Sequence, residues 1–586
     1  MSEATCDFEA VVIGSGFGGA ISCCRLAQRW PGKVLLLERG RRYPMGSFPR
    51  TPKDMSQNFW NYEPGKGGGP KHVRDDKLIG MFDIRNFEHM DSVTCAGYGG
   101  GSLIYANVFL EPPEAVFAQG WPSGMDRATL APYYAVAREV LAARPVPDWT
   151  PGNANDPRRI ERTEVFERVA QETGRVSKRA DVCVFFGNDS KVPLPIGQQD
   201  LNRYGARQTS CTYCAECDVG CNTHSKNTVD LNYLHVAEHQ HGAQIRTERM
   251  ATSICPLALR NGALVPDPAA TGEHGYQVRV RNVISDKDEV VTAQRVVVSA
   301  GTLNSNELLL RARDRDKTLP RLSQCLGQRF SGNGDFLSFV VQGEFPSSPN
   351  YGPVITQYTD HNLYADFQRD RAFLLEDAGY PAFASWYIDA QPGNALHGLG
   401  RALGTALTHI RNLIPGIGTG NLGPLLKDFL SADLNATSEV LLCMGLDAGD
   451  GCLTLSEEGD VNLHWPQQNS MALYEEILAS GREFSALVGG KKFIPLPTWF
   501  WPLRNNVTVH CLGGCTLANG PDNGVTHGNP TDPSQRGEAF DYRGLYVADG
   551  SLLPTAVGAN PIATISAVSE WVAEGITGIR PHADLR

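Results

Sequence analysis

The sequence lacks a long uninterrupted run of apolar residues, and this absence excludes a membrane-spanning helix. Such a helix needs roughly 18 or more consecutive apolar residues, and no stretch of this 586-residue chain provides them. The sequence also lacks an excess of basic residues, because 53 Lys and Arg stand against 64 Asp and Glu, giving a net charge of −11. Nucleic-acid binding needs concentrated Lys and Arg to neutralise phosphates. We therefore expect neither a membrane span nor a nucleic-acid partner.

The beginning of the chain has little room for a secretion signal. Residues 1–7 carry Glu3 and Asp7, and an apolar run follows at once. A basic segment, an apolar segment and a cleavage site do not fit there. The 15 cysteines are an odd number and indicate reduced thiols rather than a disulfide framework. We therefore expect a cytoplasmic protein.

The stretch Phe8–Gly40 has the pattern of a dinucleotide-binding unit. An apolar run at 10–13 predicts a buried strand, and apolar residues at 20–27 have helical spacing. Between them, three glycines follow the order G-x-G-x-x-G: Gly14, Gly16 and Gly19. They allow a tight turn, a close pyrophosphate and close helix–strand packing. Glu38 ends a second strand about 20 residues on, where a carboxylate binds ribose hydroxyls and disfavours NADP. FAD and NAD both remain open.

Two later glycine-rich stretches indicate further contact with a ligand. Residues 95–112 contain four glycines in five residues, which predicts backbone lying against a flat or phosphorylated ligand. A strand ending at Gly301 leads into a helix expected at 305–313, repeating the first strand–turn–helix unit. We expect this second turn to lie beside the first.

Four cysteines have the spacing C-x2-C-x2-C-x3-C of a bacterial ferredoxin loop: Cys211, Cys214, Cys217 and Cys221. Asn222 replaces the proline that follows the fourth cysteine in ferredoxins, and no second cysteine cluster completes a pair. Iron–sulfur, zinc, disulfides and simple packing stay open, and we expect no bound metal.

Apolar runs at 336–342, 383–389 and 439–444 predict strands of a largely antiparallel sheet in a separate substrate domain. Residues 132–143 predict a short helix. Between strands, residues 396–430 are rich in Leu, Ile, Gly and Pro. They predict either an amphipathic lid over an apolar pocket or a buried helical pair, and we prefer the lid.

Several stretches between residues 11 and 567 resemble the glucose–methanol–choline (GMC) flavin oxidoreductases, and within them the bacterial cholesterol oxidases. They are VVIGSGFGGA, GYGGGSL with EP after it, SKNTVDLNYL, SAGTLNSNELLLRARD, HxLGGC and LYVADGSLLPTAVGANPIATISA. The resemblance implies an α/β FAD-binding Rossmann-like domain interleaved with an α+β substrate domain on an antiparallel sheet. We expect the FAD domain at 1–50, 88–130, 226–335 and 505–586, and the substrate domain at 51–87, 131–225 and 336–504.

The resemblance also implies roles for individual residues. Those expected to contact FAD are Gly14, Gly16, Gly19 and Glu38 at its ADP half, Gly101, Ser102 and Asn107 on the flavin side, Gly301 near the adenosine, Asp549 and Gly550 near the ribityl phosphate, and Pro561 at the start of the last helix. His510 and Asn560 match the paired polar residues that face flavin N5. An imidazole accepts the hydroxyl proton during hydride transfer, and an amide hydrogen-bonds and orients the alcohol. With no histidine in the early glycine motifs, we expect non-covalent FAD.

Glu376 resembles, by position, the glutamate that acts as base in steroid double-bond isomerisation. The alternative is a solvated residue beside Asp377. Four departures from the family pattern put cholesterol in doubt: Tyr105-Ala106 replaces Asn-Gly, Cys511 replaces a proline, the four-cysteine loop is additional, and so are residues 396–430.

The resemblance then implies an oxidase of small hydrophobic alcohols, with aliphatic primary alcohols ahead of sterols. It would pass a hydride to flavin N5 and use molecular oxygen, giving an aldehyde or ketone and hydrogen peroxide. The alternatives are a 3-hydroxysteroid oxidase with isomerase activity, and an FAD dehydrogenase that passes electrons through an iron–sulfur cluster to a carrier. The oligomeric state stays open.

Overall fold

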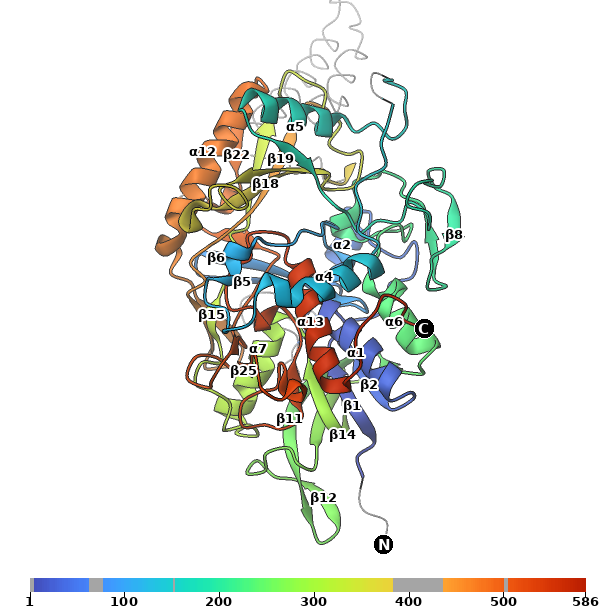
Figure 1. Ribbon diagram of the computed structural model, residues 1–586, viewed down its shortest axis with the longest axis vertical. Helices are drawn as coiled ribbons and strands as arrows, with labels where there is room; N and C mark the ends of the chain where they lie inside the picture. The colour runs from blue at the N-terminus through green and yellow to red at the C-terminus, as the bar shows by residue number, and fades with distance from the viewer. Residues whose placement is uncertain (1–4, 63–76, 151–152, 383–435, 500–503) are drawn as a thin grey trace, which may run out of the picture.

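The computed structural model describes residues 5–62, 77–150, 153–382, 436–499 and 504–586. The segment 383–389, for which a strand is expected, and the segment 396–430, for which a lid is expected, lie outside these residues. Figure 1 shows two regions, one around β1 and β14 and the other around β18 and β19, each built on its own sheet.

The first region contains a mixed eight-stranded sheet with a parallel core. Its parallel strands, in spatial order, are β10 (Gln244–Arg246), β2 (Val34–Leu37), β1 (Phe8–Ile13), β14 (Lys287–Val298) and β26 (Leu545–Val547). The other half of β14 begins an antiparallel extension through β13 (Tyr276–Asn282), β11 (Arg249–Arg260) and β12 (Ala263–Pro266). β1 and β2 are almost wholly apolar and buried, as expected for strands covered on both faces.

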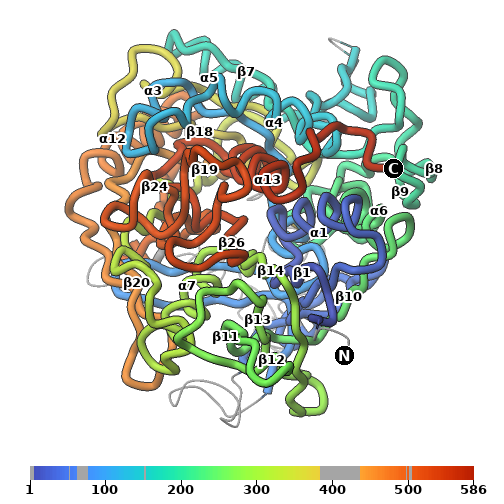
Figure 2. Tube along the Cα trace, turned by 60° about the horizontal axis from the view of Figure 1, so that its bottom comes forward, coloured from blue at the N-terminus to red at the C-terminus, as the bar shows by residue number. Residues whose placement is uncertain are grey.

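Helices cover this sheet. α1 (Phe17–Arg29) packs against α6 (Tyr233–His239) and α13 (Ile562–Thr577), and α13 packs against α4 (Arg127–Val140). Figure 2 shows α1 and α13 side by side, although they come from opposite ends of the sequence. α4 starts five residues before the expected helix at 132–143, because the Asp126 side chain caps its first turn by accepting the Thr129 N–H. Pro132 therefore lies inside the helix.

The second region contains a six-stranded antiparallel sheet, so the expected antiparallel substrate sheet is confirmed. Its strands, in spatial order, are β22 (Lys492–Pro495), β16 (Phe336–Val341), β19 (Glu439–Gly445), β18 (Phe373–Ala378), β17 (Gln357–His361) and β7 (Ser177–Arg179). α5 (Glu161–Glu172) and α12 (Met471–Leu487) cover one face of it (Figure 1).

Side chains alternate between the two faces of this sheet. Phe373 and Leu375 pack under α5 and α12, as do Leu441 and Cys443 of the neighbouring strand. The residues that alternate with them, such as Leu374, Glu376 and Leu442, therefore point to the opposite face. That face is the one that carries candidate functional groups.

Shorter elements complete the described chain. They are α2 (Pro52–Ser56), β3 (Trp60–Asn61), β4 (Leu78–Ile79), β5 (Phe82–Phe87), β6 (Met90–Cys95), η1 (Gly100–Leu103), α3 (Glu114–Phe117), β8 (Gln199–Leu201), β9 (Arg207–Thr209), η2 (Cys217–Val219), α7 (Thr302–Leu310), β15 (Gln328–Phe330), β20 (Gly451–Leu455), β21 (Val461–His464), β23 (Asn506–Thr508), β24 (Leu517–Ala518), β25 (Thr526–His527) and η10 (Gly550–Leu552).

Candidate active site

The first glycine turn joins β1 to α1 and lies against the second one. Gly14 has a left-handed φ of +98°, and a Cβ there would lie 2.3 Å from the Ser299 carbonyl oxygen. At Gly19, a Cβ would lie 2.0 Å from the Gly14 carbonyl oxygen. A side chain at either position would collide with backbone atoms of this protein, so both positions need glycine whether or not a ligand binds. Ser299 closes the strand before Gly301, so the two turns are neighbours, as expected.

Gly16 and Gly101 are different, because nothing in the described chain requires a glycine there. Gly16 has extended backbone angles, and a Cβ at either position would meet no atom within 4 Å. The space in front of Gly16 is at the start of α1, whose first turn has neither a side-chain cap nor an acidic residue. Its N–H groups are therefore free for an anion. This cradle fits the pyrophosphate of a dinucleotide.

Glu38 ties the first turn to the glycine-rich segment. Its carboxylate accepts the Ser15 N–H at 3.1 Å, the Ser15 hydroxyl at 2.5 Å and the Gly40 N–H at 2.8 Å. The Ser15 hydroxyl oxygen in turn accepts the Gly99 N–H at 3.0 Å. Burial raises the pKa of Glu38, which these hydrogen bonds partly offset. A carboxylate offers about four acceptor positions, so Glu38 keeps capacity for a ribose hydroxyl.

Ser102 and Asn107 follow in the same segment. The Ser102 side chain is hydrogen-bonded within the described chain, whereas the Asn107 side chain is not. The Ser102 hydroxyl donates to Gly99 O at 2.7 Å and accepts the Val229 N–H at 3.1 Å, so it holds the loop itself. Asn107 is fully buried with a left-handed φ of 73°, and neither polar atom of its side chain has a partner in the described chain. Buried amides are nearly always paired. The Asn107 side chain therefore has hydrogen-bonding capacity left for a bound polar group.

Asp549 links the two glycine turns from the end of β26. One carboxylate oxygen accepts the Gly301 N–H at 2.9 Å and the Ser305 hydroxyl at 2.5 Å. The other accepts the N–H and hydroxyl of Ser551. Its oxygens are thus used within the chain, and it orders the backbone of Gly301 and Gly550. Pro561 precedes α13, whose first turn also has no side-chain cap.

His510 is held by a carboxylate that sequence reasoning missed. Its Nδ1 lies 2.7 Å from Asp335 Oδ1. The other oxygen of Asp335 accepts the Thr508 hydroxyl at 3.0 Å and the Val509 N–H at 2.9 Å. Because the carboxylate accepts a hydrogen bond from the protonated Nδ1, Nε2 is left as the nitrogen with the free lone pair. The His510 side chain is 14% exposed, so Nε2 is open to a substrate.

Asn333 holds the second catalytic candidate. Its Oδ1 accepts the N–H groups of Val557 at 2.9 Å and Gly558 at 3.1 Å, and its Nδ2 donates to Ala559 O at 2.9 Å. These bonds fix the turn immediately before Asn560. The loop 331–335 therefore positions both His510, through Asp335, and Asn560, through Asn333.

Asp447 fixes the shape of that loop. Its carboxylate accepts the Ser331 hydroxyl at 2.7 Å and the N–H groups of Gly332 and Gly334 at 2.9 and 3.1 Å. Burial raises the pKa of Asp447 to about 6. The glycine-rich, polar sequence SGNGD directly before a buried strand is the signal that points to an organising loop at 331–335.

Asn560 lies beside Glu376, at the face of the substrate sheet opposite α5 and α12. Asn560 Nδ2 lies 3.4 Å from the sulfur of Met444, a weak acceptor, and its Oδ1 is buried without a partner. Glu376 is 0% exposed, and no hydrogen bond is formed by its carboxyl oxygens within the described chain. The expectation of a solvated Glu376 is therefore wrong, because β18 is buried throughout. Burial above all raises the pKa of Glu376 well above its usual range, and Asn560 is near enough to oppose this.

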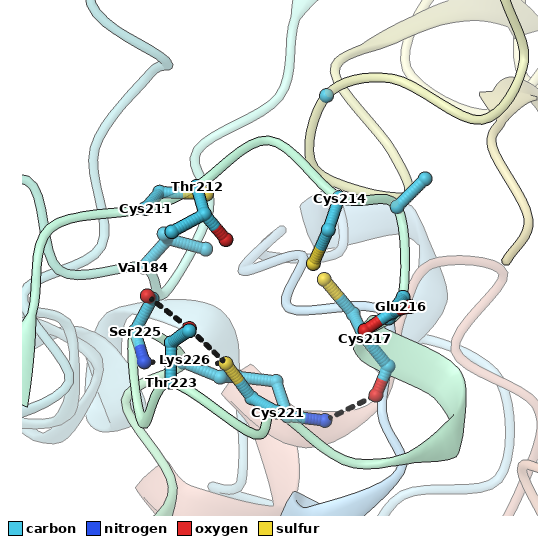
Figure 3. A pocket seen from close by; sticks show the side chains of 12 residues that line it. Val184, Cys211, Thr212, Cys214, Glu216, Cys217, Cys221, Thr223, Ser225 and Lys226 are labelled. Atoms are coloured by element: carbon cyan, nitrogen blue, oxygen red, sulfur yellow. Dashed lines mark hydrogen bonds between the residues drawn. The ribbon is translucent and has the colours of Figure 1, made fainter. Parts of the chain in front are cut away.

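The four cysteines of the ferredoxin-like spacing line one small recess (Figure 3), together with Glu216 and Lys226. All four are free thiols. Within the ranges described, no three His, Cys, Asp or Glu side chains are placed to hold a single metal ion. In the same ranges, no helix has the length and apolar character needed to cross a membrane.

Family models described as GMC oxidoreductase match residues 18–314 and 500–569. A cholesterol oxidase of Acinetobacter baumannii is 26% identical, with 96% of this chain and 93% of that protein covered. A long-chain-alcohol oxidase of Arabidopsis thaliana is 21% identical, covering 97% of this chain and 68% of that protein. A fungal aryl-alcohol oxidase structure has a TM-score of 0.57 at 14% identity, covering 98% of this chain and 99% of that one.

Proposed function

The chain belongs to the GMC oxidoreductase family, whose cofactor is FAD, and on this basis we propose that it oxidises a hydrophobic alcohol with molecular oxygen as the electron acceptor. The substrates we favour are aliphatic primary alcohols, ahead of sterols. The products are an aldehyde or ketone and hydrogen peroxide. The observation that carries the proposal is the His510–Asp335 pair, fixed by the same loop that fixes Asn560.

FAD, when bound, would supply the acceptor for the hydride of the alcohol carbon. The proton left on the alcohol oxygen goes to Nε2 of His510, because the hydrogen bond from Nδ1 to Asp335 orients the ring and leaves Nε2 as the acceptor nitrogen. Asn560 donates from Nδ2 to the alcohol oxygen, exchanging the weak sulfur contact to Met444 for a stronger acceptor. The two side chains thus hold the same oxygen from two sides, which fixes the C–H bond for transfer.

The substrate sheet supplies an apolar surface beside these groups. Its open face carries a cluster of buried apolar side chains, with partly buried ones packed against it: Leu337, Phe339, Val341, Val440, Leu442 and Ile494. Such a surface favours an alkyl chain over a sugar or another polar alcohol. The long-chain-alcohol oxidases among the relatives support the same substrate class.

Peroxide formation tests the substrate class. We expect kcat/KM to rise along a series of primary alcohols from butanol to decanol, and to exceed that for cholesterol. A series with no dependence on chain length, or activity only toward polar alcohols, would contradict an apolar substrate pocket.

A sterol is the second candidate, and Glu376 is the observation that favours it. A buried carboxyl without a hydrogen bond, next to Asn560, is suited to move a proton on the substrate after oxidation. Cholesterol oxidases are among the relatives at 26% identity. If cholesterol is the better substrate, the steroid product should be isomerised by the wild type and left unisomerised by Glu376→Gln.

Replacing Gly16 by valine should remove FAD and leave the fold intact. The backbone at Gly16 accepts a side chain, and the added atoms would occupy only the open space at the start of α1. We expect purified Gly16→Val to have lost most of its flavin absorbance, with an unchanged far-UV spectrum. The matched control is Gly520→Val, which also adds atoms to open space and should keep the flavin. A Gly16→Val protein with full flavin content would place the pyrophosphate elsewhere.

Glu376 should also make stability depend on pH. The pKa of Glu376 is raised in the folded protein. The folded protein therefore keeps the proton of Glu376 at pH values above about 4.3, the ordinary pKa at which the unfolded chain releases it. The stability that this proton contributes is complete below that value and is lost as pH rises through the folded pKa. The Tm of Glu376→Gln minus that of the wild type should therefore increase from pH 5 to pH 9. Parallel Tm curves would mean that Glu376 is not protonated in the folded protein.

A further inference from the structure

The cysteines of the 211–221 loop are a group of reactive side chains that alcohol oxidation leaves without a role. All four line one recess, and Cys214 and Cys217 point toward one another across it (Figure 3). The loop has an unusual backbone, because Tyr213 and Ala215, on either side of Cys214, have left-handed φ values of 58° and 52°. Such angles are uncommon for residues with side chains and concentrate at functional sites.

Backbone amides point at two of the sulfur atoms. The Tyr213 N–H donates to Cys211 Sγ at 3.4 Å, and the Ser225 N–H donates to Cys221 Sγ at 3.2 Å. The Thr223 hydroxyl lies 3.4 Å from the same Cys221 sulfur. Donors of this kind stabilise a thiolate and tune the potential of thiolate-bound clusters.

A buried lysine next to the recess lacks a carboxylate partner. Lys226 is 1% exposed, and its ammonium donates to the carbonyl oxygens of Cys217 at 2.7 Å, Leu103 at 2.8 Å and Tyr105 at 3.1 Å. The buried carboxyl groups of Asp218 and Asp230 are near enough to interact with its charge, but among the described residues neither forms an ion pair with it. A buried charge is unfavourable unless an opposite charge compensates it. Four thiolates around a metal–sulfur core would supply that negative charge.

The loop also connects the active site with the surface. Leu103 and Tyr105 belong to the glycine-rich segment beside Gly16 and Gly101, and η2 of the loop packs on η1 of that segment. Asp218, which follows Cys217, lies close enough to His510 for their charges to interact. At the other side of the recess, Cys214 is exposed to solvent. A redox group here would lie between the alcohol site and an external partner.

We propose that Cys211, Cys214, Cys217 and Cys221 bind one [4Fe–4S] cluster. In two-cluster ferredoxins the fourth cysteine of this spacing binds the other cluster, but here Cys221 lines the same recess as the other three. Among the described residues, no three of these side chains are placed to hold a single ion. A cluster does not require this, because each cysteine binds a different iron.

The cluster provides a second route for the electrons of alcohol oxidation, in addition to their transfer to oxygen. Oxidation of one alcohol to its carbonyl releases two electrons and two protons. The cluster takes the electrons one at a time and passes each to a one-electron acceptor protein docked near Cys214. Two acceptor molecules are thus reduced per alcohol, and the two protons pass to solvent. This step rests on the proposed alcohol oxidation for its electrons, whereas binding of the cluster does not.

Metal analysis of the full-length protein, purified and reconstituted anaerobically, tests the site. We expect about four iron atoms and four acid-labile sulfides per chain, and an EPR signal after reduction by dithionite. Cys217→Ser should lose this signal. Cys325→Ser, whose thiol lies outside the recess and donates to Asp522 O, should keep it. Flavin absorbance in both variants serves as the check on folding.

Wild-type protein that holds flavin but no iron and sulfide after reconstitution overturns the proposal, as does stoichiometric zinc. Equal iron in Cys217→Ser and Cys325→Ser also overturns it. Reduction of ferricenium, a small one-electron acceptor, by alcohol tests the electron exit and should be slower in Cys217→Ser than in Cys325→Ser. Anaerobic bleaching of the flavin by alcohol tests alcohol oxidation without involving the cluster. A protein that bleaches but holds no cluster contradicts only the cluster proposal, and a protein that holds a cluster but does not bleach contradicts only the proposed function.

Discussion

His510→Ala should lower kcat for alcohol oxidation by about 10²–10⁴-fold, the usual contribution of one general base. Without the imidazole, the hydroxyl proton has no acceptor at the position that Asp335 now fixes with a 2.7 Å hydrogen bond to Nδ1. Binding of FAD should be unaffected, since the glycine cradle lies on other elements. The measurement is the rate of anaerobic flavin reduction under single-turnover conditions, which separates this step from oxygen chemistry.

The matched control is His464→Ala, which removes an exposed imidazole on β21. We expect its rate to equal that of the wild type. If His510→Ala reduced its flavin as fast as His464→Ala does, His510 would not be the base, and the active site would have to be assigned to other residues.

Asp335→Asn should lower kcat by roughly 10²–10⁴-fold while leaving KM nearly unchanged. An amide donates where the carboxylate accepts, so Nδ1 would become the acceptor and the proton would move to Nε2. His510 would then present a donor to the alcohol instead of a base. Asp335 is a positioning residue that touches no substrate, and the split between kcat and KM distinguishes this role from a loss of binding.

Asp370→Asn is the control for that substitution, because the Asp370 side chain is 84% exposed. It should behave as the wild type. A variant Asp335→Asn with normal kcat would show that the tautomer of His510 does not depend on this carboxylate. An equal loss in Tm and flavin content would instead indicate a structural effect of the loop 331–335.

The parts of the molecule with strong local patterns could be predicted from the sequence. Gly14, Gly16 and Gly19 stand between a buried strand and a helix. The tight turn at Gly14 and the close packing at Gly19 follow from this spacing. The substrate strands at 336–341 and 439–445 could be predicted because their apolar runs are continuous. The α4 start was misplaced, since Pro132 resembles a first-turn proline more than Asp126 resembles a cap.

The polar network around the catalytic candidates could not be predicted, because its contacts join residues far apart in sequence. Asp335 lies 175 positions from His510 and Asn333 more than 220 from the turn it fixes. The local sequence SGNGD indicates an organised loop at 331–335, but nothing in it shows that Asp335 contacts His510. Likewise, Glu376 and Asp377 are adjacent in sequence, yet their side chains point to opposite faces of the sheet. Asp377 reaches Arg162 of α5, whereas Glu376 lies beside Asn560.

The visible spectrum of the anaerobic protein, before and after addition of a medium-chain primary alcohol, tests the central claim most directly. Our account predicts an oxidised flavin spectrum that bleaches promptly in the wild type, and slowly or not at all in His510→Ala. A flavin that stays oxidised with every primary alcohol of the series and with cholesterol would contradict the proposal that this site oxidises hydrophobic alcohols.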